Sequence, residues 1–251
     1  MQRFAICYRI FTAHDAFNKM TVLGFFGKLP SQGDFVSRNL SYDLIESWDE
    51  WLQEVLGYSQ QQLGEQWEAY FSRCPPWRIA CAPGICGTQA FIGVLFPSSD
   101  RVGRRFPLLV GTPLPGEPRL TMLPLIYKDC LHQIEKLVSK ALQERFDLDV
   151  FTQQLLRLDL PQQKYPNRPV SYTASITYDG YFLLQNRKDF ATAVVRISSL
   201  SIGSIWWSRG NAEVNPCFVV CRTLPALERF AAFLNGDWDR LGWQRQPTTA
   251  P

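Results

Sequence analysis

Two apolar periods alternate along this chain, and they constrain its fold more than any other feature. In SYDLIESWDEWLQEVLG, residues 41–57, apolar residues return every three or four positions, as on one face of a helix. The runs WRIACA at 77–82, AFIGVLF at 90–96 and PLLVGTPL at 107–114 are short, apolar and bounded by turn residues, which predicts strands. A long helical pattern follows over 122–145. Strands interleaved with long helices predict an α/β fold with helices on both faces of a sheet.

The C-terminal half continues the same mixture of patterns. Residues 170–185, VSYTASITYDGYFLLQ, alternate between apolar and polar and contain Asp179-Gly180, a strong signal for a tight hairpin turn. SIWW and PCFVVCR predict two more strands, whereas 190–200 fits a helix or a strand. LPALERFAAFLNG, residues 224–236, predicts a closing helix that stops at its final glycine. Because hairpins join neighbouring strands, we predict a mixed β-sheet rather than a purely parallel one.

The ends of the chain differ from its middle. Residues 1–19 show neither helical nor strand period and precede Met20, so we expect a loosely ordered leader or a misassigned translation start. Residues 20–236 carry all the periodic segments and predict a single α/β domain. From residue 237 to 251 we expect a flexible tail, in which two tryptophans could still dock on the core.

Charge and composition exclude several classes of function. The net charge is +3 and no block of like charges is longer than Arg104-Arg105, whereas nucleic-acid binders concentrate basic residues. No apolar stretch approaches the roughly 18 residues of a membrane span. With two histidines and no C-x-x-C spacing among seven cysteines, the chain lacks material for a His-based triad or a zinc site. We therefore expect no enzyme activity, no metal, no nucleic acid and no membrane insertion, and buried thiols in a reducing cytoplasm.

A glycine-lysine pair follows the first predicted strand, in FGKLPSQGDF at residues 26–35, and raises the question of a phosphate-binding loop. Such a loop needs G-x-x-x-x-G-K-[ST], because its amides wrap the phosphates and its hydroxyl binds magnesium. Here Gly24 lies three residues before Gly27 instead of five. Leu29 replaces the hydroxyl, and Pro30 stands where a helix should begin. These departures argue against a bound nucleotide, and we expect no cofactor.

What remains at this position is a sharp turn. Gly33-Asp34 allows a tight backbone with an Asx-type hydrogen bond, and Leu29 and Phe35 can anchor the turn to the core. One interpretation is a connection that binds no ligand. The other is recognition of a protein partner through the polar side chains of the turn, which are Lys28, Ser31, Asp34 and Arg38.

A second polar loop, FPSSDRVGRRFPL at residues 96–108, joins two predicted strands. Its arginines flank Gly103 and could clamp a carboxylate or a phosphate, because a guanidinium group binds either one through two parallel hydrogen bonds. Alternatively, Asp100 and one arginine pair simply to shape the end of a hairpin. The candidate binding residues of this loop are Ser99, Asp100, Arg101 and Arg104.

We expect the two loops to meet at one end of the sheet. Both leave strand-like segments, and their basic groups are complementary to Asp34 and Asp100. One carboxylate would hold an arginine in place and leave the remaining basic groups for an acidic or phosphorylated partner. Removing one member of such a pair leaves the other charge uncompensated. On this reasoning Asp34 should matter for stability, and Lys28 for partner capture.

Five stretches of the sequence, taken in order, resemble one protein family. They are GFFGKLPSQGDFVSRNL, WDEWLQ, PPWRIACAPG, PSSDRVGRRFPL and SIWWSRG, and they run from Gly24 to Gly210. On these stretches the chain is similar to the type VI secretion-associated family TagF, also called ImpM. In that family the F-G-K-L-P motif lies near the start of the chain, which agrees with a leader before it here.

The resemblance implies a cytoplasmic accessory protein of the type VI secretion system with a three-layer αβα sandwich. It further implies post-translational repression of secretion through a protein partner, the forkhead-associated scaffold Fha. A link to the Ser/Thr kinase–phosphatase pair that controls assembly is also implied. The family offers no catalytic residues to carry over.

An alternative function is a phosphorylated-ligand-binding protein or an enzyme that uses the loops 28–34 and 98–105. The scarcity of histidine argues against an enzyme, whereas the clustered arginine and aspartate side chains keep the alternative open. If the two loops met in one concave pocket, ligand binding would be favoured. If they lay on a flat or convex face, a protein interface would be favoured.

Overall fold

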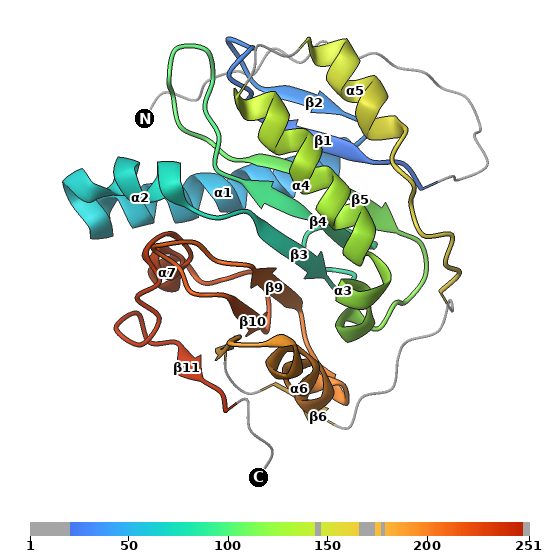
Figure 1. Ribbon diagram of the computed structural model, residues 1–251, viewed down its shortest axis with the longest axis vertical. Coiled ribbons are helices and arrows are strands. Elements are labelled where there is room, and N and C mark those ends of the chain that lie inside the picture. Colours follow the sequence, from blue (N-terminus) through green and yellow to red (C-terminus); the bar gives the residue numbers. More distant parts are fainter. Residues whose placement is uncertain (1–20, 144–146, 166–173, 177–178, 248–251) are drawn as a thin grey trace.

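The computed structural model describes residues 21–143, 147–165, 174–176 and 179–247, so the expected leader and the last four residues lie outside the described part. Its centre is a nine-stranded sheet (Figure 1). The strands of this sheet are β1 (Gly24–Gly27), β2 (Val36–Arg38), β3 (Trp77–Cys81), β4 (Ala90–Phe96), β5 (Leu108–Leu114), β7 (Gly180–Leu183), β9 (Ser204–Ser208), β10 (Cys217–Cys221) and β11 (Gln244–Arg245).

The strand order divides the sheet into two halves. The N-terminal strands occur in the order β3-β4-β5-β1-β2, and the C-terminal strands in the order β11-β7-β10-β9. The halves join where β3 pairs with β9, in a register that places Arg78 opposite Trp207. All neighbours in this sheet are antiparallel except β7 and β11, which are parallel. The predicted mixed sheet is therefore confirmed.

Both faces of the sheet are covered by helices. Because successive side chains of a strand point to opposite faces, Phe25 and Phe26 belong to two separate buried clusters. One cluster packs under α3 (Leu123–Ile126), α4 (Lys128–Gln143), α5 (Leu148–Leu156) and α6 (Arg187–Ile197), and the other under α1 (Tyr42–Leu63), α2 (Trp67–Arg73) and α7 (Ala231–Asn235). This three-layer arrangement confirms the α/β fold with helices on both faces.

The first helix is longer than its sequence pattern indicated. We predicted an end at Gly57, but α1 continues to Leu63 and ends at Gly64, whose φ is 53°. A glycine inside a helix costs only about 1 kcal/mol relative to alanine, and Ser59 in the extra turn is buried. The long helix predicted over 122–145 is divided at Tyr127 into α3 and α4.

The hairpin predicted around Asp179-Gly180 does not form. β7 pairs with β10 and β11, whereas β6 (Ala174–Ser175) pairs with β8 (Leu200–Ser201) in a separate small sheet. The side chain of Asp179 instead accepts a hydrogen bond from the backbone N–H of Arg222, at 2.9 Å. A local turn signal is thus overridden by pairing with distant strands. The ambiguous segment 190–200 is mostly helical, within α6.

Residues 237–247 return to the sheet, although we expected a flexible tail from residue 237. Trp238 and Trp243 are only 4% and 3% exposed, and β11 extends the sheet next to β7. The indole of Trp243 also donates to the carbonyl oxygen of Arg229, at 2.9 Å. Burial of two large aromatic side chains therefore orders this segment.

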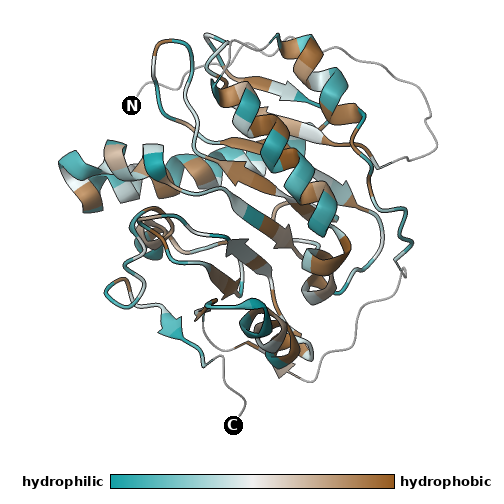
Figure 2. Cartoon of the chain, viewed as in Figure 1, coloured by the Kyte–Doolittle hydropathy of each residue, from teal (hydrophilic) through white to brown (hydrophobic). Residues whose placement is uncertain are grey.

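The outer faces of the helices are mostly hydrophilic, as Figure 2 shows for α4. None of the helices in the described part is long and apolar enough to cross a membrane. The six cysteines of that part are free thiols, five of them buried, as expected.

Candidate functional site

The two polar loops meet, as predicted, at one end of the sheet. We call residues 28–34 the first loop and residues 97–107 the second loop. Figure 1 shows the second loop as the green hairpin at the upper left, beside the blue turn that leads into β2. The backbone N–H of Arg101 donates to the carbonyl of Gln32 at 2.7 Å, and Ser98 Oγ donates to the carbonyl of Lys28 at 2.7 Å. These bonds fix one loop on the other.

A buried carboxylate lies at the centre of this loop pair. The side chain of Asp100 is 0% exposed and accepts four hydrogen bonds. Two come from side chains, Lys28 Nζ at 3.0 Å and Arg104 Nε at 2.6 Å. Two come from the backbone N–H groups of Val102 and Arg104, at 3.1 and 2.9 Å. The carboxylate therefore closes the second loop on itself and ties it to the first.

Two opposing effects set the protonation of Asp100. Burial alone raises the pKa of this carboxyl group, because it disfavours the charged form. The hydrogen bonds from Arg104 and Lys28, with the positive charge of Lys28, outweigh burial and lower the pKa of Asp100 to about 2. The group is thus a fixed anion at neutral pH.

The side chain of Lys28 lies buried between the two loops. It is 6% exposed, and its ammonium lies 5.0 Å from the centre of the Phe35 ring as well as against Asp100. Phe35 in turn packs edge-on against Phe106, with ring centres 4.8 Å apart. This burial does not fit the expectation that Lys28 contacts a partner; it neutralises Asp100 instead. The predicted anchoring by Leu29, 2% exposed, and Phe35 is confirmed.

The glycine before Lys28 has a steric role. Gly27 adopts a φ of 139°, a region that side chains rarely allow, and a Cβ there would overlap the carbonyl oxygen of Pro107 in the second loop. The Gly-Lys pair that suggested a phosphate loop is thus explained by packing. Glycine lets the loops approach, and lysine supplies the charge that Asp100 needs.

The remaining candidate residues lie nearer the surface. Asp34, Arg38, Arg101 and Arg104 are exposed, and Ser31 and Ser99 are half-buried. Asp34 accepts a hydrogen bond from the N–H of Phe35 at 2.8 Å and, within the described part of the chain, forms no ion pair. Of the two carboxylates considered, Asp100 therefore holds the arginine. The stabilising role expected of Asp34 belongs to Asp100.

The outer surface of the loop pair is basic. Arg104 Nη2 donates to the carbonyl of Gly33 at 2.8 Å while its Nε holds Asp100, so this side chain bridges the loops from outside. Arg101 and Arg105 are exposed, and no ion pair to either is found among the described residues. Arg38 extends from β2 and donates to the adjacent carbonyl of Ser37.

The surface where the loops meet is only slightly concave. A hollow of about 130 Å³ lies beside them, lined in part by Pro30, Ser99 and Arg105. Pockets for drug-sized ligands and cofactors enclose about 300–1,000 Å³. The hollow has room for a single phosphate or carboxylate group, not for a nucleotide.

A second ion pair, largely buried, was not predicted from the sequence. Arg78 of β3 donates to both carboxylate oxygens of Glu135 on α4, each at 2.7 Å. The signal was present, because a charged residue within the apolar run WRIACA must find a partner when the strand is buried. In the described part of the chain, no group of three or more His, Cys, Asp or Glu side chains could hold a metal ion.

Comparison with known proteins places these features in a family. The model of the TagF N-terminal domain, described as type VI secretion system-associated, matches residues 24–158, which include both loops. The chain is also similar to the crystal structure of PA0076 from Pseudomonas aeruginosa PAO1. The sequence identity is 33%, the TM-score is 0.68, and the match covers 86% of this chain and 94% of that one. No curated protein matches the chain.

Proposed function

The chain belongs to the TagF family of type VI secretion-associated proteins, and from this premise we propose that it is a regulator that acts by binding another protein. It would repress secretion after translation, in the cytoplasm, by occupying a surface of the forkhead-associated scaffold Fha. Through Fha it would influence the kinase–phosphatase pathway that controls assembly. It would perform no chemistry of its own.

The observation that carries this proposal is the basic surface of the loop pair. Arg101 and Arg105 are presented by a loop that Asp100 holds in place. A loop that is already ordered loses little conformational entropy when a partner binds. Arginine side chains in such a loop suit a carboxylate or a phosphorylated side chain of the partner.

The state of Asp100 supports binding over the alternative of an enzyme. A general base must accept a proton near the working pH, and a carboxylate with four hydrogen bonds and a pKa of about 2 is poorly suited to do so. The small hollow beside Arg105 favours a side chain of a protein over a free nucleotide. A phosphorylated side chain of the partner would fit this hollow beside Arg105.

Charge reversal at the surface of the loop pair tests the proposal. In the variant Arg101→Glu/Arg105→Glu, Asp100 and its four hydrogen bonds remain, so the melting temperature should change by less than about 2 °C. Capture of purified Fha should weaken by about tenfold or more, and secretion should no longer be repressed. Arg157→Glu, an exposed arginine at the end of α5, serves as the matched control.

Unchanged capture in the double variant would contradict the proposal, as would equal weakening in Arg157→Glu. Each capture is repeated with Fha treated with phosphatase. A loss of binding on that treatment would identify the recognised group as a phosphate, and retained binding would identify a carboxylate surface. Turnover of ATP or of a phosphopeptide that copurifies with the folded wild-type chain would contradict the proposed absence of enzyme activity.

A further inference from the structure

A large groove crosses the face of the sheet that carries α3, α4 and α6. Its volume is about 740 Å³, and its floor includes Trp207 of β9 and Leu184 beyond β7. Its walls come from α3 on one side and α6 on the other, both of which Figure 1 shows on the viewer's side of the sheet. We call it the helix groove. The apolar side chains that matter for the argument are Met122, Leu125, Leu184, Phe190, Val195 and Trp207.

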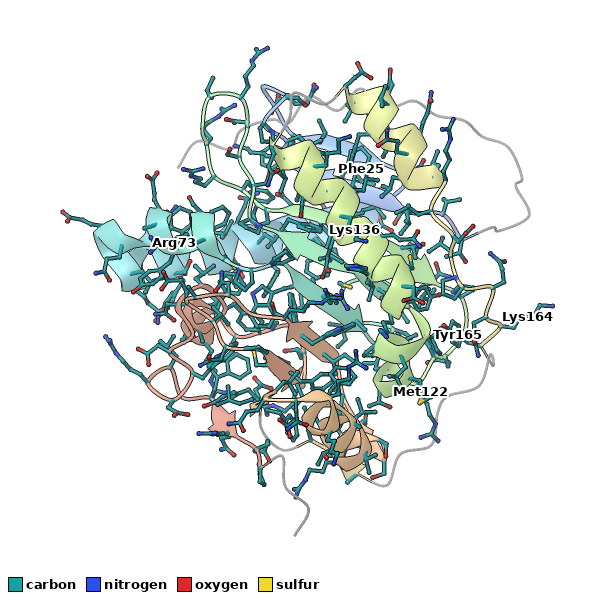
Figure 3. All side chains as sticks on the ribbon, viewed as in Figure 1. Phe25, Arg73, Met122, Lys136, Lys164 and Tyr165 are labelled. Carbon is teal, nitrogen blue, oxygen red and sulfur yellow. The ribbon has the colours of Figure 1, made fainter. Side chains whose placement is uncertain are left out.

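The rim of the helix groove exposes large apolar side chains on both walls. Met122 and Leu125 are 45% and 53% exposed, and Val195 on the opposite wall is 70% exposed. Figure 3 labels Met122, the residue immediately before α3. Single exposed apolar residues are ordinary, but a cluster around an apolar groove is typical of an interaction site.

The charged side chains of the helix groove all have the same sign. Four basic residues line it, and no acidic residue is among the described residues that do so. Arg78, at the floor, is neutralised by Glu135 of α4. Lys128, Arg187 and Arg209 are exposed, and the described residues provide no ion pair for them. Three positive charges without an ion-pair partner among the described residues therefore surround an apolar surface, and the nearby carboxylate of Asp189 caps α6 through the N–H groups of Gln185 and Asn186.

The positive surface continues along α4. A second hollow, of about 460 Å³, shares Ser208 and Arg209 with the helix groove and adds Lys136. Figure 3 labels Lys136 on α4 and Met122 on the same side of the molecule. The only acidic residue among those lining this hollow is Glu135, which Arg78 already binds. An elongated partner could thus lie along α4 and meet Lys128, Lys136 and Arg209.

We propose that the helix groove binds the apolar face of an amphipathic helix that carries acidic residues and belongs to another protein. A groove between two helices accepts a third helix through side chains spaced three and four residues apart. The uncompensated lysine and arginine side chains fit glutamate or aspartate along its flanks. This inference deepens the proposed function and rests on it, since it identifies a second surface for the secretion partner.

The two longest segments outside the described part do not have the acidic composition of this helix. The segment 1–20 has three basic residues and one acidic residue, and 166–173 has one arginine and no acidic residue. The acidic outer side of α1, with Glu46, Glu50 and Glu54, could be offered by a second copy. However, the apolar side of α1 is buried in its own core, so it has no apolar face for the groove.

A synthetic peptide tests the inference with the full chain. The probe is a fluorescein-labelled helix of about 18 residues, with leucines spaced three and four apart and glutamates on the flanks. Its counterpart has lysine at every glutamate. By fluorescence anisotropy the acidic peptide should bind at least about tenfold more tightly than the basic one. Leu125→Glu and Val195→Glu should each weaken that binding by about tenfold or more.

Val150→Glu is the matched control, because Val150 is 45% exposed on α5 outside the groove, and it should leave binding unchanged. Equal binding of both peptides, no binding, or equal weakening by Val150→Glu would overturn the inference. A dimer that dissociates in Val195→Glu, measured by sedimentation, would also overturn it in favour of a second copy. Tighter binding to phosphatidylglycerol vesicles than to the peptide would overturn it in favour of a lipid.

The two proposals fail separately. Arg101→Glu/Arg105→Glu changes the loop pair, none of whose residues lines the helix groove, so it should leave peptide binding unchanged. If that variant loses Fha while the peptide does not bind the wild-type chain, only the helix groove is rejected. If the peptide binds and the double variant still captures Fha, only the role of the loop pair is rejected.

Discussion

Replacement of Asp100 should destabilise the whole fold, although this residue lies in a loop. Asp100→Ala would leave the ammonium of Lys28 buried without its counter-charge, and two backbone N–H groups without an acceptor. Breaking a buried ion pair by removing one partner costs about 3–5 kcal/mol. The pKa gives a second measure, because a fall from 3.8 to about 2 corresponds to roughly 2.5 kcal/mol. We expect a loss of about 3–5 kcal/mol for Asp100→Ala.

Chemical denaturation measures this loss of stability, and a double-mutant cycle shows how much of it comes from the ion pair between Lys28 and Asp100. Lys28→Met keeps the aliphatic stem but removes the charge, while Arg104 still pairs with Asp100, so its cost should be smaller. Asp100→Asn combined with Lys28→Met should cost less than the sum of the two single changes, by about 0.5–3 kcal/mol. Asp34→Asn, a change at an exposed carboxylate without an ion pair, should stay within about 0.5 kcal/mol.

The same reasoning fixes the sign of a pH effect. A carboxyl group whose pKa is lowered by folding stabilises the fold above its unfolded pKa, near 4, and this contribution is lost as the pH falls through its folded value of about 2. Between about pH 6 and pH 1, wild type should therefore lose roughly 2.5 kcal/mol more than Asp100→Asn. Identical pH curves for the two proteins, or a cost of Asp100→Ala below about 1 kcal/mol, would refute the argument.

Three other substitutions test the packing. Gly27→Ala should lower the free energy of unfolding, measured by chemical denaturation, by at least about 1–3 kcal/mol, because alanine is strained at this φ and its Cβ would overlap Pro107. A neutral effect would contradict the close approach of the loops. Arg78→Met should lower the free energy of unfolding by about 3–5 kcal/mol, because it leaves the carboxylate of Glu135 without its partner. The double variant Arg78→Met/Glu135→Met should cost much less, and equal costs would exclude a coupled pair. Trp243→Ala should lower stability by about 3–5 kcal/mol in thermal melts, whereas a loose tail would show no change.

Sequence patterns predicted those parts of the fold that depend on interactions between residues close together in the sequence. The strand at 90–96 has the predicted bounds, because an apolar run between turn residues can be buried on both faces. Asp147 caps α5 through the N–H groups of the first turn, because its short carboxylate stands directly before the helix. The prediction of a hairpin at Asp179-Gly180 was wrong, because the strand that begins there, β7, pairs with β10 and β11.

The candidate site was predictable only in part. Complementary charges in two loops were enough to predict that the loops meet. They could not show that Asp100, rather than Asp34, is the buried acceptor, because burial depends on how Phe35 and Phe106 pack over the loops. The helix groove left no local signal, because its walls are separated by about sixty residues and join only in the folded chain.

The junction of β3 with β9 has a consequence for synthesis on the ribosome. The strand β3 ends at residue 81 and its partner β9 begins at residue 204, so 123 residues must be added before they can pair. At about 5–20 residues per second this takes roughly 6–25 s, during which one border of β3 can pair with a neighbouring nascent chain. The charged Arg78 lies near one end of that border and opposes such misassembly. A residue that forms one half of an ion pair in the finished protein would then also act as a gatekeeper before the protein is complete.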